Sequence, residues 1–289
     1  MARDSAARDG SPTARRIILG AQLRRLREEA EVLPAEAARA IRGSESKISR
    51  MELGRVSLKE RDIADLLTLY GVHHEGERAH FLQLVAESRQ PGWWNRYAEA
   101  MPPWFQDYVG LEGVAARIQT YELQFVPGLL QIEDYAMALA SSGHPALADD
   151  DARRRVSLRM KRQKLLARPN APRLWAVIDE SVLHRPIGGI AVMRAQVDHL
   201  LEMTRLPNIA LQVVPFALSG YAAEGSFTVL RFAEPELPDV VYLEHLSGAL
   251  YLDKREEVER YSRTLDRLMV DARPPEQTRQ MLRKVREAL

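Results

Sequence analysis

Cysteine is absent from all 289 residues of the sequence. Disulfide bonds, cysteine nucleophiles and zinc sites with cysteine ligands are therefore excluded. The 7 histidines form no HExxH or other metal-ligand spacing, so no metal site is expected. The GxSxG, P-loop and GxGxxG patterns are missing as well. Because no catalytic or cofactor-binding motif is present, we expect neither enzyme activity nor a cofactor.

Long hydrophobic runs are also missing. No segment reaches the roughly 18 apolar residues that a membrane-spanning helix needs, and the first residues lack the apolar core of a signal peptide. We therefore expect a cytoplasmic protein without a membrane partner. Residues 1–14 begin with the aperiodic stretch MARDSAARDGSP and are predicted to form a flexible tail.

The net charge is only +1, so a basic field over the whole chain is absent too. Positive charge is concentrated in two places instead. Bases outnumber acids between residues 11 and 59, and the stretch RRRVSLRMKRQKLLAR at 153–168 contains no acid. The second stretch predicts a helix with Val156 and Met160 on its apolar stripe and the arginines outside. That helix fits a second DNA contact, a solvated face or a surface for an acidic protein partner.

Residues 15–89 are predicted to form an all-helical domain. Leucines recur every three or four residues from Leu19 to Leu26, which is the stripe of an amphipathic helix. Pro34 suits the first turn of a second, short helix, since its missing N–H would have no partner there. Apolar residues at the same spacing indicate two further helices after residue 57.

The segment GSESKISRMELGR, residues 43–55, predicts one more helix between these. The opening glycine lies in the preceding turn, Ser44 is the N-cap and Gly54 ends the helix. With about 100° per residue, Ile48 and Met51 share the inward face. Two short helices joined by a glycine turn, packed on longer helices, describe a helix-turn-helix domain.

The outward face of this helix is predicted to contact double-stranded DNA. In the major groove Arg50 would bond guanine and Glu45 would accept from a cytosine amine, whereas Lys47 and Arg55 suit phosphates. One small module contacts few base pairs, so we expect a homodimer over half-sites about 34 Å apart. The full set of predicted DNA-binding residues is Ser44, Glu45, Ser46, Lys47, Ser49, Arg50 and Arg55.

Residues 17–72 resemble the phage-repressor-like, or Xre-type, helix-turn-helix family in the spacing of LRRLRE, AARAI and SESKISRMELGR. In that family a helix-one arginine often pairs with a glutamate near the end of the recognition helix. The resemblance implies a structural ion pair between Arg27 and Glu52, which removes Glu52 from the DNA contacts. Pro34 stands where many members carry a phosphate-contacting glutamine, so that contact is expected to be missing.

The composition changes at residues 90–110, where prolines and glycines break helices and aromatic residues gather. The segment contains three of the 4 tryptophans. Large aromatic residues mostly serve burial, which favours packing at a junction between two domains. The alternative interpretation is an aromatic clamp for a ligand or nucleotide.

Residues 111–289 predict a larger α/β domain. The segment ARIQTYELQFVPGLLQIEDYAMALA predicts a helix, a break at Pro127 and Gly128, and a second helix. Five short runs rich in Val, Leu and aromatics predict strands: RLWAVID, IALQVVP, SFTVLRF, VVYLEH and ALYLD. Helices are predicted between the first two runs and after the last. The fold class is thus multidomain α and α/β, an all-α helix-turn-helix domain followed by an α/β domain with a mixed sheet.

The phrases GWWNRY, FVPGLLQ, RMKRQ, DESVLHRPIGG, LQVVPF and VYLEH occur in this order. They resemble a large actinobacterial family that places an Xre-type domain before a C-terminal domain of uncharacterised function. Its members are described as antitoxin-like transcriptional regulators and tend to be encoded beside small partner proteins. The resemblance implies a sequence-specific transcriptional regulator whose C-terminal domain binds a small-molecule effector or a small co-encoded protein. The alternative is an antitoxin that neutralises that protein by direct binding and regulates its own gene.

Candidates for lining an effector pocket or a partner surface come from the aromatic junction and the predicted strands. The candidate residues are Trp93, Trp94, Trp175, Glu180, Tyr242 and Glu244, with Tyr221, Phe227 and Tyr251 as further pocket residues. The two acids fit capping or salt-bridging roles equally. An enzyme-like C-terminal domain, using the acids and histidines of DESVLH and YLEH, is the less favoured alternative.

Overall fold

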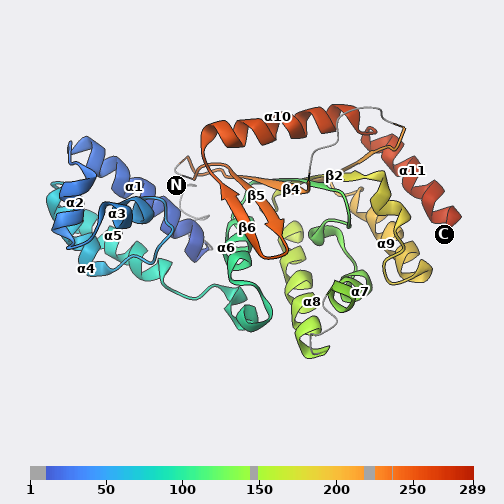
Figure 1. Ribbon diagram of the computed structural model, residues 1–289, viewed down its shortest axis with the longest axis horizontal. Coiled ribbons are helices and arrows are strands. Elements are labelled where there is room, and N and C mark those ends of the chain that lie inside the picture. The colour runs from blue at the N-terminus through green and yellow to red at the C-terminus, as the bar shows by residue number, and fades with distance from the viewer. Residues whose placement is uncertain (1–10, 144–148, 218–224, 236) are drawn as a thin grey trace. The chain divides into compact units, whose positions relative to one another are not determined.

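The computed structural model describes residues 11–143, 149–217, 225–235 and 237–289. The chain divides into two compact units (Figure 1). The helical unit extends to Asn95 and includes the short segment 233–238, and the sheet unit comprises Arg96–Phe232 and Asp239–Leu289. Residues 96–110, predicted as part of a junction, therefore belong to the sheet unit.

The helical unit contains the five helices predicted from the sequence. Its core is one apolar cluster in which the inward residues of the predicted helices meet, including Leu19, Ile48, Met51 and Leu66. Each of these four side chains is buried. The helices are α1 (Pro12–Glu29), α2 (Pro34–Ala40), α3 (Glu45–Glu52), α4 (Glu60–Leu69) and α5 (Glu75–Ser88).

Helix α1 begins earlier than the sequence predicts. Residues 12–14 are helical rather than part of a tail, because the Ser11 hydroxyl accepts from the Thr13 N–H at 3.2 Å and Pro12 occupies the first turn. Thr13 and Ala14 are buried. The remainder of the predicted tail, residues 1–10, lies outside the described residues.

Backbone geometry around α3 differs from the prediction at one end and agrees at the other. In the turn before α3 the left-handed conformation belongs to Arg42, with φ 51°, and not to Gly43. After α3, Gly54 has φ +64°, and a Cβ atom there would lie 2.6 Å from the Ile17 Cα. Only glycine fits this position, since both the backbone angle and the close approach of α1 exclude a side chain.

The sheet unit is built on a six-stranded mixed sheet in the order β3-β2-β1-β4-β5-β6. β1, β2 and β3 are parallel, whereas the pairs β1–β4, β4–β5 and β5–β6 are antiparallel. The mixed sheet and the five predicted strands are confirmed. The strands are β1 (Arg117–Glu122), β2 (Arg173–Asp179), β3 (Ile209–Val214), β4 (Phe227–Arg231), β5 (Val240–His245) and β6 (Gly248–Leu252).

The central strand β1 lies where the sequence predicts the start of a helix, and that prediction is wrong. Its Gln119 and Thr120 are polar but buried, so β1 does not read as a short run of apolar residues. Gln119 accepts from the Arg231 guanidinium at 2.7 Å, and Thr120 accepts from the Thr228 hydroxyl at 3.0 Å. These partners lie 112 and 108 positions along the chain, so no local pattern could reveal them.

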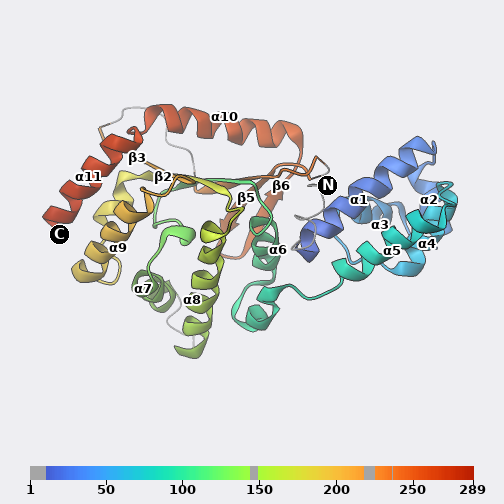
Figure 2. The same ribbon diagram turned by 180° about the vertical axis from the view of Figure 1, so that it is seen from behind.

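Helices cover both faces of the sheet (Figures 1 and 2). The helices α7 and α8 connect β1 to β2, and α9 connects β2 to β3. Both connections move toward the same edge of the sheet, the one formed by β3. Since parallel crossovers are right-handed, these helices lie on one face, together with α6. The helices of this face are α6 (Pro103–Glu112), α7 (Glu133–Gly143), α8 (Asp149–Gln163) and α9 (Ile190–Met203).

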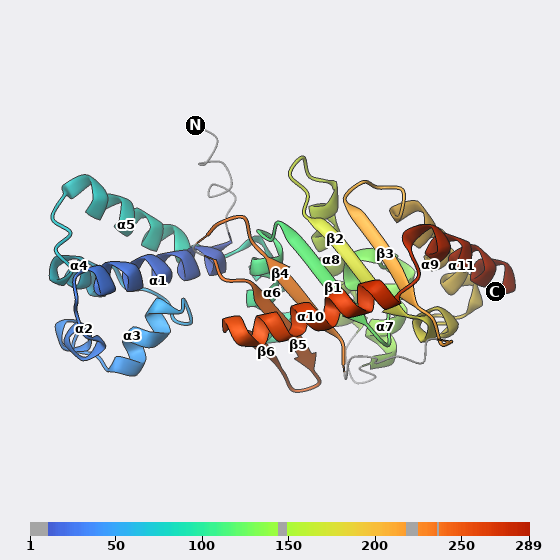
Figure 3. The same ribbon diagram turned by 90° about the horizontal axis from the view of Figure 1, so that it is seen from above.

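The opposite face is crossed by α10 (Arg255–Asp271), as Figure 3 shows, and α11 (Pro275–Ala288) packs beside β3 and α9. Leu265 and Leu268 of α10 join Tyr121, Val177 and Val229 of the strands in an apolar cluster. Short 3-10 helices complete the chain: η1 (Trp93–Ala100), η2 (Gly128–Leu130), η3 (Lys164–Ala167) and η4 (Glu180–His184).

Candidate nucleic-acid interface and candidate ligand cavity

Helix α3 separates buried from exposed residues in the way the sequence predicts. Ile48 and Met51 are 1% and 2% exposed, and the Ser44 hydroxyl caps the helix by accepting from the Lys47 N–H at 3.2 Å. The outer face carries exposed polar side chains, Glu45, Ser46, Ser49 and Arg50, and Arg55 after the helix is exposed too. Hydrogen-bonding side chains are thus gathered on one face of a short helix.

Lys47 differs from its neighbours on α3 because its side chain is already engaged. Its ammonium forms an ion pair with Asp62 of α4 at 2.5 Å, and the Asp62 side chain is only 9% exposed. A buried carboxylate depends on such a partner. Lys47 therefore has a structural task, and its contact with phosphate stays a prediction.

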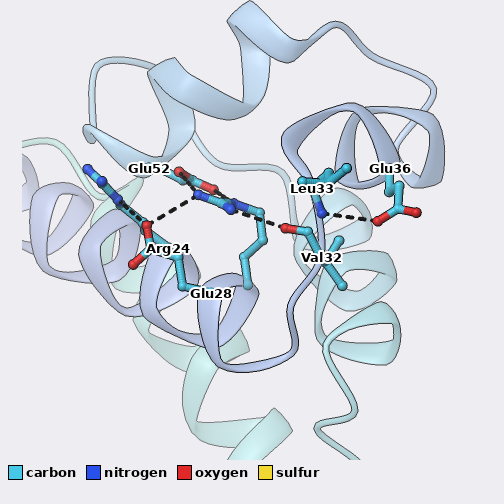
Figure 4. Close-up of polar contacts among 7 residues, drawn as sticks. Arg24, Glu28, Val32, Leu33, Glu36 and Glu52 are labelled. Atoms are coloured by element: carbon cyan, nitrogen blue, oxygen red, sulfur yellow. Dashed lines mark hydrogen bonds and ion pairs between the residues drawn. The ribbon is translucent and has the colours of Figure 1, made fainter.

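Arg27 of α1 and Glu52 of α3 form a bidentate ion pair, with nitrogen–oxygen distances of 2.6 and 3.1 Å. Figure 4 shows Glu52 and the Val32 carbonyl around this guanidinium, which donates to Val32 at 3.1 Å. The hydrogen bond to Glu52 raises the pKa of Arg27 above its ordinary value. The pair ties α1 to the end of α3 and turns Glu52 away from the outer face.

A cavity of about 1090 Å³ lies in the sheet unit. Because β5 runs in the same direction as β1, and β4 in the opposite direction, the ends of β1 and β5 meet the start of β4 at one edge of the sheet. The cavity lies at that edge, and residues of the helices α6, α7, α8 and α10 complete its lining. Its lining includes residues 122–126, 225–228 and 242–245.

Two carboxylates and a serine form a row on the helix-covered face at this edge. Tyr121 pairs with Phe227 across β1 and β4, and Thr228 pairs with Tyr242 across β4 and β5. Continuing both registers places Glu122, Ser226 and Glu244 side by side. Glu122 is partly buried, whereas Glu244 is exposed at the mouth of the cavity. Burial raises the pKa of Glu122 to about 7, and the nearby Glu244 adds to the shift.

Helix α8 brings two arginines to the cavity. Arg162 forms a buried bidentate pair with Glu112 of α6, at 2.8 and 2.7 Å, and its guanidinium lies 4.8 Å from the Phe105 ring centroid. Burial opposes the charge of Arg162, but the attraction of Glu112 raises its pKa above the ordinary value. This charge is fully compensated.

Arg159 is held differently, although it lies one turn away. It donates to the Gln131 side chain, and Gln131 in turn donates to the Val126 carbonyl at 2.6 Å. Burial, together with repulsion from Arg162, lowers the pKa of Arg159 to about 10. In the described chain no carboxylate lies within 4.0 Å of this guanidinium.

Tyr242 adds a polar atom without a partner. The residue is only 5% exposed, and its hydroxyl makes no hydrogen bond within normal limits to any described residue. Burial raises the pKa of this hydroxyl, as does the charge of Glu244. The Tyr242 ring packs on Tyr108 of α6 with centroids 4.2 Å apart. The hydroxyl therefore lies at the cavity wall near Glu244, without a hydrogen bond of normal length to the described residues.

Some of the predicted pocket residues line the cavity, and others lie elsewhere in the structure. Tyr242, Glu244 and Phe227 line the cavity. Trp175 donates instead to Gln212 at 2.7 Å, and Glu180 accepts from the Phe216 N–H at 2.7 Å.

The remaining aromatic candidates do not line the cavity either. Trp94 is buried and packs edge-on against Trp93 with centroids 5.9 Å apart. The Tyr251 hydroxyl donates to the Trp104 carbonyl at 2.5 Å. Tyr221 lies outside the described residues.

Three charged residues of the cavity, Glu122, Arg159 and Arg162, are not among the sequence candidates. Glu122 was hidden because β1 was read as a helix. The arginines of the basic stretch 153–168 are predicted to face outward, which is wrong for Arg159 and Arg162: the latter is 8% exposed, because Glu112 compensates its charge. The spacing of Arg159, Arg162 and Gln163, three and four residues apart, is the signal that places them on one helix face.

No group of three or more described His, Asp or Glu side chains is arranged to hold a metal ion. Among the described helices, none is long and apolar enough to cross a membrane.

Comparison with known protein families identifies both units. A helix-turn-helix domain model matches residues 18–81, which supports a DNA-binding regulator. A model of the domain of unknown function DUF5753 matches residues 105–284, which include most of the sheet unit and the whole cavity lining. No characterised protein and no solved structure matches the chain. Since the second model covers more than half of the sequence, the chain belongs to the DUF5753 family and carries an N-terminal helix-turn-helix domain.

Proposed function

We propose that the protein is a sequence-specific transcriptional regulator of the Xre type that binds DNA as a homodimer through α3 and is controlled by a small molecule bound in the cavity of the sheet unit. The cavity is the observation that carries the regulatory half of this proposal. The match to the helix-turn-helix family supports the DNA-binding half.

The outer face of α3 supports sequence reading. Arg50 is exposed, and among the residues that the structure describes its side chain bonds only the Ser46 carbonyl of its own helix, at 3.2 Å. Guanine presents two acceptors in the major groove that a guanidinium bonds in pairs, whereas phosphate contacts carry no sequence information. We therefore assign base contacts to Glu45, Ser46 and Arg50, and a phosphate contact to Arg55.

Binding rather than turnover fits the cavity. Its volume of about 1090 Å³ lies slightly above the roughly 300–1,000 Å³ of small-molecule sites. The cavity offers carboxylates and guanidiniums at the end of a sheet, an arrangement suited to holding a charged ligand, and we propose that it has no enzymatic activity.

The test uses the full chain. Duplexes selected from a random-sequence pool would identify the preferred operator, and gel-shift titration would compare its affinity with that of random DNA. Arg50→Ala should reduce operator affinity about tenfold or more while leaving random-DNA affinity within about twofold. Equal losses on both DNAs would refute the base-reading role of Arg50.

The regulatory half is tested with the same operator. Small-molecule fractions of a cell extract that raise the melting temperature of the protein should also change its operator affinity. Leu139→Trp, which adds a large ring to the cavity lining, should abolish both effects, whereas Leu206→Trp at an exposed position outside the lining should retain them. If instead a small protein co-purifies and alone changes operator affinity, the antitoxin-like alternative holds and the small-molecule proposal fails.

A further inference from the structure

Two opposite charges face the same cavity without touching each other. Glu122 rises from the end of β1, and Arg159 reaches in from α8. No arginine or lysine nitrogen of the described residues lies within 4.0 Å of the Glu122 carboxylate, and no carboxylate lies that close to Arg159. Charges in a partly buried site normally pair, so their separation requires an explanation.

The surrounding hydrogen bonds hold the two charges apart. Arg159 is anchored by Gln131, whose own amide donates to Val126 and whose backbone carbonyl accepts from Gln163 at 2.7 Å. On the other side, Ser226 stands beside Glu122 and its hydroxyl accepts from the Leu123 N–H at 3.2 Å. A neighbouring arginine, Arg162, is fully occupied by Glu112 and takes no part.

The electrostatics agree with incomplete compensation. Burial raises the pKa of Glu122 to about 7, and burial lowers the pKa of Arg159 to about 10. Each group moves toward its neutral form, even though each also feels the attraction of the other. A ligand that carried a positive charge to Glu122 and a negative charge to Arg159 would satisfy both at once.

The remaining lining describes the body of such a ligand. Phe105, Tyr108 and Phe125 supply aromatic walls, whereas His245 and Arg260 add polar side chains. The buried Tyr242 hydroxyl makes no hydrogen bond of normal length to the described residues. The cavity of about 1090 Å³ leaves room for a large side chain or a second residue beyond the charged groups.

We propose that the cavity binds a zwitterionic ligand of the amino-acid type, an amino acid with a large apolar side chain or a short peptide. Its ammonium group lies at Glu122, with Glu244 at the mouth, and its carboxylate lies at Arg159. This inference rests on the proposed function for its regulatory meaning but not for its chemistry.

The test is a charge matrix measured by isothermal titration calorimetry on the full chain at pH 7, below the pKa of roughly 8 of an α-amino group, so that the free amines are mostly protonated. The probes are L-tryptophan and leucyl-phenylalanine, each in four forms: free, with the carboxylate amidated, with the amine acetylated, and with both blocked. At least one free probe should bind about tenfold or more tightly than either of its singly blocked forms, because each block removes a charge-assisted hydrogen bond.

Two variants assign the groups. Glu122→Gln should remove the preference for a free ammonium, and Arg159→Gln should remove the preference for a free carboxylate. Glu256→Gln and Arg153→Gln are matched controls at exposed positions outside the cavity lining, and both should bind like the parent. Far-ultraviolet circular dichroism of every variant would show that loss of binding is not loss of folding.

Several results would overturn the inference: no binding of any form at millimolar concentration, equal binding of blocked and free forms, or charge preferences that survive in both variants. Its failure is distinguishable from failure of the proposed function. Zwitterion binding without any change in operator affinity would leave the ligand class standing and refute the regulation. A neutral or singly charged molecule that binds in the cavity and shifts operator affinity would support the regulation and refute the zwitterionic ligand class.

Discussion

The buried pair between Glu112 and Arg162 offers the sharpest test of how the sheet unit is held together. The two side chains are 2% and 8% exposed and share two hydrogen bonds of 2.7 and 2.8 Å. Glu112→Gln keeps the size of the side chain but removes its charge. Arg162 would then be a buried cation without a carboxylate within 4.0 Å among the described residues.

The expected cost follows from that isolation. Removing one partner of a buried, hydrogen-bonded ion pair costs about 3–5 kcal/mol, because the remaining charge keeps its desolvation penalty. Unfolding by urea has a slope of roughly 2–3 kcal/mol per molar for a unit of this size. Glu112→Gln should therefore lower the urea midpoint of the sheet unit by about 1–2 M.

Tryptophan fluorescence can report on this unit alone. Replacing Trp93 and Trp94 by phenylalanine leaves Trp104 and Trp175, which both belong to the sheet unit. Glu259→Gln is the control, since Glu259 pairs with Arg255 on the surface, and exposed pairs contribute little.

A double replacement separates charge isolation from a packing defect. Replacing Glu112 by leucine and Arg162 by methionine together should recover most of the lost stability, because apolar residues of similar size often substitute for a buried pair. A urea midpoint for Glu112→Gln that shifts no more than that of the surface control would refute a large cost of leaving Arg162 without its carboxylate.

Three further predictions concern other sites. The raised pKa of Glu122 means that the folded protein keeps a proton which the unfolded chain releases, so the free energy of unfolding falls as pH rises from about 4.5 to about 7. Glu122→Gln should therefore raise the urea midpoint at pH 8 and leave it nearly unchanged at pH 5. Gly54→Ala should destabilise the helical unit by about 2 kcal/mol or more in thermal unfolding, because the added Cβ would clash with Ile17. Gly71→Ala, at φ +77° with open space around it, should cost about 1 kcal/mol. Equal costs for the two variants would contradict the clash with Ile17. Lys47→Ala should lower the free energy of unfolding by about 1–3 kcal/mol, because it leaves the buried Asp62 carboxylate without its ion-pair partner. Adding Asp62→Asn should restore most of that stability. No loss of stability in Lys47→Ala would show that Lys47 has no structural role.

The helical unit was predictable because its signals are local. The N-cap at Ser44, the glycine stop at Gly54 and the inward pair Ile48 and Met51 all lie within a dozen residues of one another. Caps, turns and helical spacing act over that range, so reading them in order recovers all five helices. Two details differ from the local patterns: α1 begins at Pro12, and the left-handed residue of the turn before α3 is Arg42 and not the adjacent glycine.

The sheet unit was predictable only in part, for the same physical reason. Strands β2 to β6 are short apolar runs and are recognisable alone, whereas β1 is buried with polar residues whose partners arrive from distant strands. The cavity depends on β1, on its register with β4 and β5, and on which face of α8 points inward. Tyr242 and Glu244 were found because their strand was found, and Glu122 was missed together with its strand.

Glu112, which binds the cavity-lining Arg162, and Glu122, which lines the cavity itself, have opposite expected effects on stability. Glu112 meets its cation, and removing its charge should weaken the fold. Glu122 does not meet Arg159, and removing its charge should strengthen the fold above pH 7. A carboxylate that lowers the stability of the empty protein can lose that penalty when a ligand brings a positive charge to it. If Glu122→Gln makes the protein more stable and at the same time weakens zwitterion binding, the two effects have one cause: the ligand supplies the positive charge that the fold withholds.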